Sequence, residues 1–217
     1  MRIRLFAAAA VIATVGFAAG AQAATLTGLF NTGVDALGNA LPNDAPEIHW
    51  LVNGSGTPSI YENGAYIVVP DAQFISAGPG GSFTQNPNTY SLTFSLVGLD
   101  PASAQLSGSF AADNFASAFL NGHLIAQDVQ SGVFSNLNTL TPFSAPGADF
   151  VSGLNTLSFV VTDTGPPSAL LVDGLSGTAD PARGGVPEPS SWAMLLVGFG
   201  GLGALMRSRR RMAVASA

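Results

Sequence analysis

Ser117-Ala118-Phe119-Leu120-Asn121-Gly122-His123-Leu124-Ile125-Ala126 is the stretch that decides the fold class of this chain. The Asn-Gly pair at its centre supplies the two positive-φ residues of a type I′ turn, which joins neighbouring antiparallel strands. Mainly apolar residues flank the turn on both sides, as they do in paired strands. The sequence therefore predicts a β-hairpin over residues 116–126.

Other short segments before and after this hairpin also have strand patterns. Residues 90–97 alternate between apolar and hydroxyl-bearing side chains, and residues 104–110 repeat the alternation. Clusters of Gly, Pro and Asn separate the segments, and we find no pattern of an amphipathic helix among them. Together they predict an all-β domain, built as an antiparallel sandwich or a barrel. Further strands are expected at residues 48–52, 65–69, 157–162 and 170–175.

The first 23 residues have the layout of a secretory signal peptide. Arg2 and Arg4 precede an apolar run over residues 5–20, and Ala21 and Ala23 supply the small side chains of a cleavage site. We predict a signal helix that engages the Sec translocon and is removed by signal peptidase after Ala23. A permanent membrane anchor is the alternative, but the run is shorter than the roughly 20 residues that a span needs.

The C-terminal region has three parts in a fixed order. A linker over residues 184–191 contains Pro187-Glu188-Pro189, an apolar segment follows at residues 192–206, and a basic tail occupies residues 207–217. Because positive charges favour the cytoplasmic side of a membrane, we predict a transmembrane helix over 192–206 and a cytoplasmic tail. Such a helix spans about 22 Å against a hydrocarbon core of about 30 Å, so the anchor is weak. The predicted membrane stop consists of Arg207, Arg209, Arg210 and Arg211.

This order of motifs resembles the PEP-CTERM sorting tails of exported bacterial proteins. The shared features are Pro187-Glu188-Pro189, Ser190-Ser191, Trp192-Ala193-Met194-Leu195-Leu196, Gly198-Phe199-Gly200 and the Arg cluster. The resemblance implies recognition near Pro-Glu-Pro by an exosortase, a membrane transpeptidase, in a Gram-negative bacterium that makes exopolysaccharide. It implies a stay in the inner membrane before delivery to the cell surface or extracellular matrix. An ordinary tail anchor is the alternative, and final anchoring, transfer or release stays open.

The body between these segments, residues 24–183, is acidic and contains neither Cys nor Lys. Residues 24–186 hold twelve acidic residues and one base, Arg183, so their net charge is near −11, while the whole chain carries −6. A protein that binds nucleic acid needs a basic face, so this charge excludes that class of partner. The absence of Cys excludes a Cys nucleophile and a thiolate zinc site.

Part of the body resembles the galactose-binding-like jelly-roll domains. Over about residues 89–179, Asp113-Asn114 ends a strand, Asn121-Gly122 turns a hairpin, and Gly153-Leu154-Asn155-Thr156-Leu157 leads into a later strand. The resemblance implies an antiparallel jelly-roll β-sandwich with a sugar ligand. Relatives often carry Asn-rich loops where this chain has Thr162-Asp163-Thr164-Gly165-Pro166-Pro167.

Sugar binding requires aromatic faces for C–H surfaces and planar polar groups for hydroxyls. Trp50 could equally be a core residue, and Asp113-Asn114 could shape a loop through side-chain hydrogen bonds to the backbone. Two hypotheses therefore stand side by side: binding of exopolysaccharide with a part in biofilm, and a structural surface role without a defined ligand. The candidate ligand residues are Asp113, Asn114, Trp50 and Tyr61, with Tyr66 and Tyr90 as further aromatics.

A cluster of acidic residues near the start of the body is a candidate metal site. Asp35, Asp44 and Glu47 flank one loop, which also contains Asn39 and Asn43. Carboxylates and loop oxygens suit a hard cation, so we consider Ca²⁺ a candidate cofactor there. The alternative is that these acids keep an exported domain soluble.

Catalytic motifs are missing from the sequence. It has no Gly-x-Ser-x-Gly elbow, no His-Glu-x-x-His and no phosphate-binding loop. Of its two imidazoles, we expect His123 on the surface and His49 on the strand face opposite Ile48 and Trp50. We predict no catalytic residues, with hydrolysis of glycans as the weaker alternative.

Overall fold

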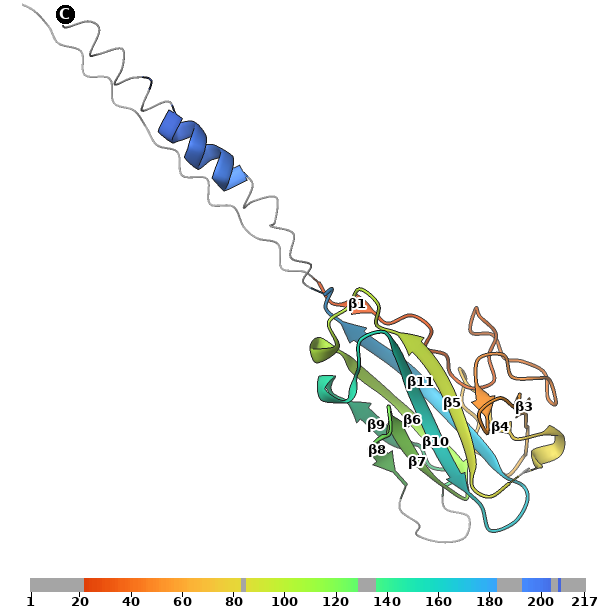
Figure 1. Cartoon of the computed structure of the whole chain (residues 1–217). Helices are drawn as coiled ribbons and strands as arrows, with labels where there is room; N and C mark the ends of the chain where they lie inside the picture. The colour runs from red at the N-terminus through yellow and green to blue at the C-terminus, as the bar shows by residue number, and fades with distance from the viewer. Residues whose placement is uncertain (1–21, 83–84, 129–135, 183–192, 204–206, 208–217) are drawn as a thin grey trace, which may run out of the picture. The chain divides into compact units, whose positions relative to one another are not determined.

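The structure is a computed structural model that describes residues 22–82, 85–128, 136–182, 193–203 and 207. Residues 22–182 lie within one compact unit. Two antiparallel sheets of this unit face one another (Figure 1). The first has the order β3 (Ser59–Ile60), β4 (Ile75–Ser76), β11 (Ala169–Ala179), β6 (Gln105–Asp113) and β9 (Thr141–Ala145), with β1 (Ala24–Thr25) also paired to β11. The second has the order β2 (Leu51–Val52), β5 (Asn88–Ser95), β10 (Leu154–Thr162), β7 (Phe115–Leu120) and β8 (His123–Gln127).

The chain crosses repeatedly between the two sheets. β5 lies in the second sheet, β6 in the first, the β7–β8 pair in the second, β9 in the first, β10 in the second and β11 in the first. This winding is the one expected of a jelly roll. For the described residues, the structure confirms the predicted antiparallel sandwich and not the alternative barrel.

Alternation of apolar and polar residues explains how the sheets pack. In β5, Leu92 and Phe94 are buried, while Thr93 between them is exposed on the outer face. Between the sheets, the rings of Phe110 and Phe159 lie 5.3 Å apart, centroid to centroid. Fully burying an aliphatic or aromatic side chain of this size stabilises the fold by roughly 1.5–3 kcal/mol. The inward-facing side chains of the long strands form one continuous core between the sheets.

The hairpin predicted over residues 116–126 is confirmed as β7 and β8. Asn121 and Gly122 have φ angles of 50° and 86°, and Leu120 pairs with His123 across the turn. His123 is exposed at this turn, as predicted.

Two predicted strands near the start of the body differ in the structure. Of residues 48–52, only Leu51 and Val52 pair in a strand, and residues 65–69 form no strand at all. Instead, Tyr66 and Phe74 pack against Leu171 in a second, smaller apolar cluster. The apolar pattern of residues 65–69 thus reflects packing against a sheet face, without a strand ladder.

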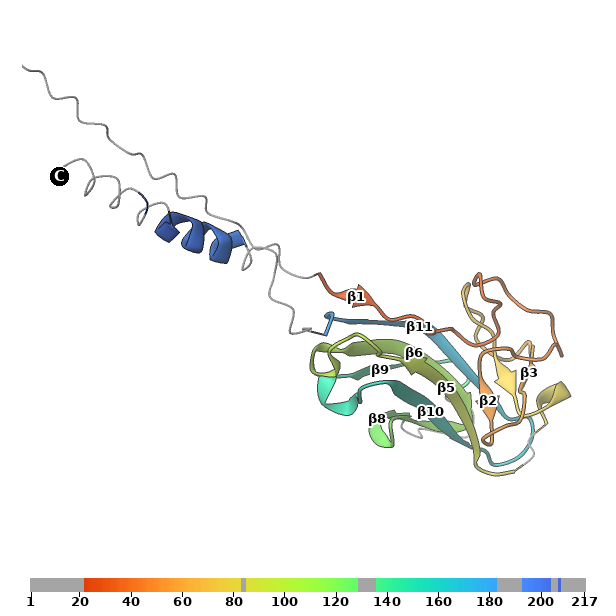
Figure 2. The ribbon, with the colours of Figure 1, turned by 45° about the horizontal axis from the view of Figure 1, so that its top comes forward.

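The two ends of the sandwich lie side by side. Ala24 of β1 pairs with Ala179 of β11, and Figure 2 shows β1 beside one end of β11. The first and the last strand of the body therefore pair with one another.

Residues 193–203 form a helix whose apolar side chains, such as Met194 and Phe199, are exposed. Of the transmembrane helix predicted over 192–206, the structure describes this part. Within the described residues, we find no helix long and apolar enough to cross a membrane. Other terminal predictions lie outside the described residues, namely the signal helix with Ala21, the Pro187-Glu188-Pro189 motif, and Arg209, Arg210 and Arg211.

Candidate functional site

Trp50, predicted as a possible sugar platform, is a core residue. It is 1% exposed, its indole N–H donates to the Phe30 carbonyl over 3.1 Å, and its ring lies 5.9 Å from that of Phe159. Tyr90 is also fully buried. Both side chains point inward between the two sheets, which corrects the prediction that Trp50 contacts a ligand and removes Tyr90 from the set of candidates.

The three acids predicted to bind Ca²⁺ serve separate structural purposes. Glu47 is 2% exposed, and its Oε2 accepts the Gly33 N–H at 2.7 Å. Its Oε1 accepts the N–H groups of Ile48 and His49 at 2.9 and 2.8 Å. Both carboxylate oxygens are therefore occupied by backbone donors.

Asp35 is engaged within its own loop, whereas Asp44 is bound from a segment 36 residues away. Asp35 accepts hydrogen bonds from the Leu37 N–H and from both nitrogens of Asn39, and the Asn39 side chain is the main cause that lowers the Asp35 pKa. Asp44 accepts from the Gly80 N–H at 3.1 Å. Across the described ranges, no three or more His, Cys, Asp or Glu side chains are placed to hold a metal ion. The described structure does not bring Asp35, Asp44 and Glu47 together as the predicted Ca²⁺ cluster, and each carboxylate already accepts hydrogen bonds.

Asp113 and Asn114 form the corner where the chain passes from β6 to β7. Asp113 accepts the Tyr66 hydroxyl at 2.5 Å and the Asn114 side-chain N–H at 2.7 Å, and burial raises its pKa. Asn114 Oδ1 accepts from the backbone N–H and the hydroxyl of Thr164, each at 2.8 Å. Both residues are buried, and their hydrogen bonds join the β6–β7 corner to the segments of Tyr66 and Thr164. This agrees with the loop-shaping interpretation.

Tyr61 borders a pocket of about 610 Å³, which we call the Tyr61 pocket. The half-buried Tyr61 ring meets Tyr66 edge-on, 5.7 Å between centroids, and its hydroxyl accepts from the Asn63 side chain at 3.0 Å. Tyr66 in turn donates to Asp113, so it connects the pocket wall to the β6–β7 corner. Of the four candidate ligand residues, Tyr61 is the one placed to meet a ligand here. The lining consists of Ala40, Tyr61, Glu62, Asn63, Gly64, Tyr66, Ile67, Val68, Val69, Pro70, Ala72, Gln73, Phe74 and Leu171.

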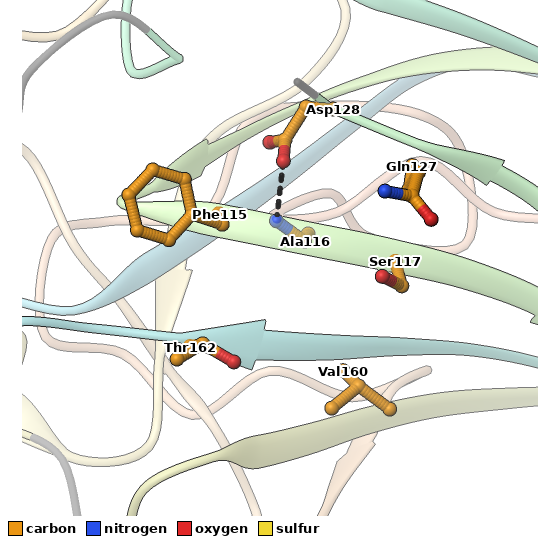
Figure 3. Close-up of a pocket in the computed structure, with 7 residues that line it drawn as sticks. All are labelled: Phe115, Ala116, Ser117, Gln127, Asp128, Val160 and Thr162. Atoms are coloured by element: carbon orange, nitrogen blue, oxygen red, sulfur yellow. Dashed lines mark hydrogen bonds between the residues drawn. The ribbon is translucent and has the colours of Figure 1, made fainter. Parts of the chain in front are cut away.

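A second pocket, of about 270 Å³, lies where β7, β8 and β10 meet, and we call it the Asp128 pocket (Figure 3). Asp128 is 8% exposed. One of its oxygens accepts the Ala116 N–H at 3.0 Å, whereas Oδ2 has no hydrogen-bond partner in the described part of the chain. Burial raises the Asp128 pKa to about 6. The lining consists of Phe115, Ala116, Ser117, Gln127, Asp128, Val160 and Thr162.

Sequence reasoning missed Asp128 as a candidate residue. It directly follows the second strand of the predicted hairpin, and no motif surrounds it. The available signal was an acidic residue at the end of a strand, in a body without Lys. Its burial depends on how β7, β8 and β10 come together, which the hairpin pattern does not specify.

Comparison with known proteins identifies the C-terminal tail. Residues 185–211 match the PEP-CTERM protein-sorting motif, so the chain carries this motif. No curated protein matches the chain in sequence.

Among solved structures, the chain is similar to the Stig cyclase Fisc from Fischerella sp. TAU. The identity is 13% and the TM-score 0.42, over 71% of this chain and 100% of that chain. It is also similar to the CBM36-1 domain of a multidomain xylanase from the hindgut metagenome of Trinervitermes trinervoides, with 13% identity, TM-score 0.31 and 63% and 98% coverage. The chain is similar as well to a carbohydrate-binding module CBM36 in complex with calcium and xylotriose. The identity is 13% and the TM-score 0.32, over 60% of this chain and 99% of that chain. These similarities are distant and indicate no function for this chain.

Proposed function

We propose that this chain, which carries a PEP-CTERM sorting motif, is an exported protein whose β-sandwich binds polysaccharide outside the cell. The single observation that carries export is the motif over residues 185–211. In this proposal the Sec translocon and signal peptidase deliver the chain, an exosortase of a Gram-negative bacterium processes its tail, and the acidic body reaches the surface or matrix.

The Tyr61 pocket supports the assignment of a polysaccharide ligand. Sugars present C–H faces that pack on aromatic rings, and Tyr61 offers a half-buried ring at the wall of a pocket of suitable size. Glu62 and Asn63 add polar groups at the same wall for sugar hydroxyls. The pocket therefore combines the two kinds of group that sugar binding needs.

We assign binding rather than catalysis to this body. The His49 ring stacks on Phe30, with centroids 3.6 Å apart and planes 2° from parallel, while His123 is exposed at the hairpin turn. Each imidazole therefore has a structural or solvent-facing position, which supports a binding protein.

Retention on polysaccharide tests the binding part of the proposal. Residues 24–182, which lie in one compact unit, are offered to a glycan array and to the exopolysaccharide of the source organism. We expect retention, a large loss for Tyr61→Ala, and near-normal retention for Tyr61→Phe, which keeps the ring. If no glycan retains the domain, the structural surface role without a ligand replaces this proposal.

Processing of the tail tests the sorting part separately. Replacing Pro187, Glu188 and Pro189 by Ala in the full chain should leave an unprocessed form in the membrane fraction of the source organism. Replacing Val214 and Ser216 by Ala, which lie outside the motif, should leave processing intact. Normal processing of the first variant would contradict recognition at this motif.

A further inference from the structure

The Asp128 pocket contains a buried carboxylate for which the body offers no cation. Between residues 24 and 182 the chain has twelve acidic residues and neither Lys nor Arg. Asp128 is more than nine-tenths buried, and its Oδ2 lacks a hydrogen-bond partner among the described residues. Buried charges in proteins are normally paired, because an unpaired charge in a low dielectric is unfavourable. An external positive group that entered this pocket would therefore be bound favourably.

The walls of the pocket carry groups that suit an ammonium ion. Strand register places Ser117 opposite Val160 on β10 and opposite Gln127 on β8, and Thr162 opposite Phe115. An ammonium group has three N–H donors, which can be shared between the Asp128 carboxylate and the hydroxyl or amide oxygens nearby. Phe115 also lines the pocket (Figure 3), and an aromatic ring offers a surface that favours a cation.

A metal ion fits the same walls less well. Calcium takes six to eight oxygen ligands, commonly with several carboxylates. Among the described residues that line the Asp128 pocket there is one carboxylate, and the other polar side chains are the hydroxyls of Ser117 and Thr162 and the amide of Gln127. One charge with neutral acceptors around it matches a single amino group.

We propose that the Asp128 pocket binds the amino group of an amino-sugar polysaccharide, a glycan with unacetylated glucosamine-type units. This inference rests on the proposed function and specifies the class of polysaccharide. The body's charge attracts a cationic polymer and repels an acidic one. The pocket volume of about 270 Å³ is large enough for a sugar unit and exceeds what a lone ammonium group needs. A sugar ring also has hydroxyls for Ser117, Thr162 and Gln127, which a Lys side chain of a protein partner lacks.

Calorimetric titration of residues 24–182 near neutral pH tests the proposal with two matched probes. The first probe is a glucosamine oligomer, and the second is the N-acetylglucosamine oligomer of the same length, which lacks the charge. We expect the free-amine oligomer to bind at least tenfold more tightly, with an affinity that falls as salt is added. Equal binding of the two oligomers overturns the proposal.

Variants show whether Asp128 provides this preference. Asp128→Asn should weaken binding of the free-amine oligomer at least tenfold, whereas Ser117→Ala should weaken it a few-fold. Asp163→Asn is the matched control, because Asp163 is also buried with an unpartnered Oδ2 but does not line this pocket. If Asp128→Asn fails to fold, as judged by its melting curve, the Ser117→Ala variant and the acetylation comparison decide.

The outcomes separate this inference from the proposed function. If the acetylated oligomer binds as well, in a manner that depends on Tyr61, polysaccharide binding stands and the Asp128 inference falls. If no glycan binds, both fall. If a Lys-rich peptide binds more tightly than the free-amine oligomer, the pocket serves a protein partner and the inference is also overturned.

Discussion

Glu47 and Asp128 are both buried carboxylates in a body without Lys, but they differ in how many hydrogen bonds the fold provides to them. Glu47 receives three backbone N–H groups on its two oxygens. Asp128 receives one from Ala116, and its Oδ2 is left without a partner in the described residues. Glu47 lies among loops whose backbone donors are free to bind it, whereas Asp128 follows a strand whose neighbours already bond each other. The comparison separates a carboxylate whose oxygens are both satisfied by the fold from one that keeps a buried oxygen without a partner among the described residues.

Replacing Glu47 by Ala should have the largest effect on stability. Three backbone donors, on Gly33, Ile48 and His49, would lose their acceptor, which should lower the free energy of unfolding by about 3–5 kcal/mol. Urea denaturation of residues 24–182 measures this change. Glu62→Ala, at an exposed position, is the control and should change it by less than about 0.5 kcal/mol. A loss below about 1 kcal/mol for Glu47→Ala would contradict the structural role.

Replacing Asp128 by Asn should change the stability of the domain in the opposite direction. The amide oxygen can still accept the Ala116 N–H, and the unfavourable buried charge is gone, so stability at pH 7 should stay equal or rise by about 1 kcal/mol. The same urea measurement applies, with Glu47→Gln as the matched change of charge to amide. Glu47→Gln should destabilise, because its side-chain NH₂ would face a backbone N–H. Destabilisation of both variants to the same extent would remove the distinction between the two carboxylates.

The pH dependence of stability should also reflect Asp128. Burial raises its pKa from 3.8 to about 6 in the folded protein, so the folded state binds the proton more tightly than the unfolded chain. The Asp128 contribution should therefore make the body more stable as pH falls from 7 through 6 toward 4. Burial shifts the pKa values of Asp113 and Asp163 in the same direction. Melting temperatures of Asp128→Asn across this range should rise less than those of the unmodified domain, and identical curves would refute the contribution.

Asp35→Asn should have the smallest effect, although Asp35 accepts as many hydrogen bonds as Glu47. Its loop is open to water, so water can replace the lost bonds. Since the pKa of Asp35 is lowered, its contribution is present above its unfolded pKa and is lost as pH falls, opposite in sign to that of Asp128. Melting temperature at pH 7 should drop less than half as far as for Glu47→Ala. A larger drop would show that the Asp35 loop is as important as Glu47.

Features encoded by short-range patterns could be predicted from the sequence. The Asn121-Gly122 turn and the alternation in β5 each follow from a few neighbouring residues, and the structure confirms both. Apolar segments without a clear period were harder. Residues 65–69 were expected to be a strand, yet their side chains pack against the face of a sheet, which hydrophobicity alone does not distinguish from strand burial.

The candidate site was less predictable, because its chemistry depends on long-range contacts. Asp113 was identified from its sequence context, but its bond to the Tyr66 hydroxyl joins residues 47 positions apart. Trp50 was a candidate ligand residue because aromatic side chains serve both cores and sugar sites. Its burial against Phe159 resolves that choice, and only a folded chain brings these two rings together.

The amino-acid sequence alone determines the sorting motif over residues 185–211, the hairpin, and the acidic, Lys-free character of the body. These properties depend on composition or on residues close together along the chain. The tertiary structure decides which of the twelve acids of the body are satisfied and which face a pocket. The reason is physical: a carboxylate is neutralised or left unpaired by donors that folding brings to it, and those of Glu47 and Asp128 include groups 14 and 12 residues away.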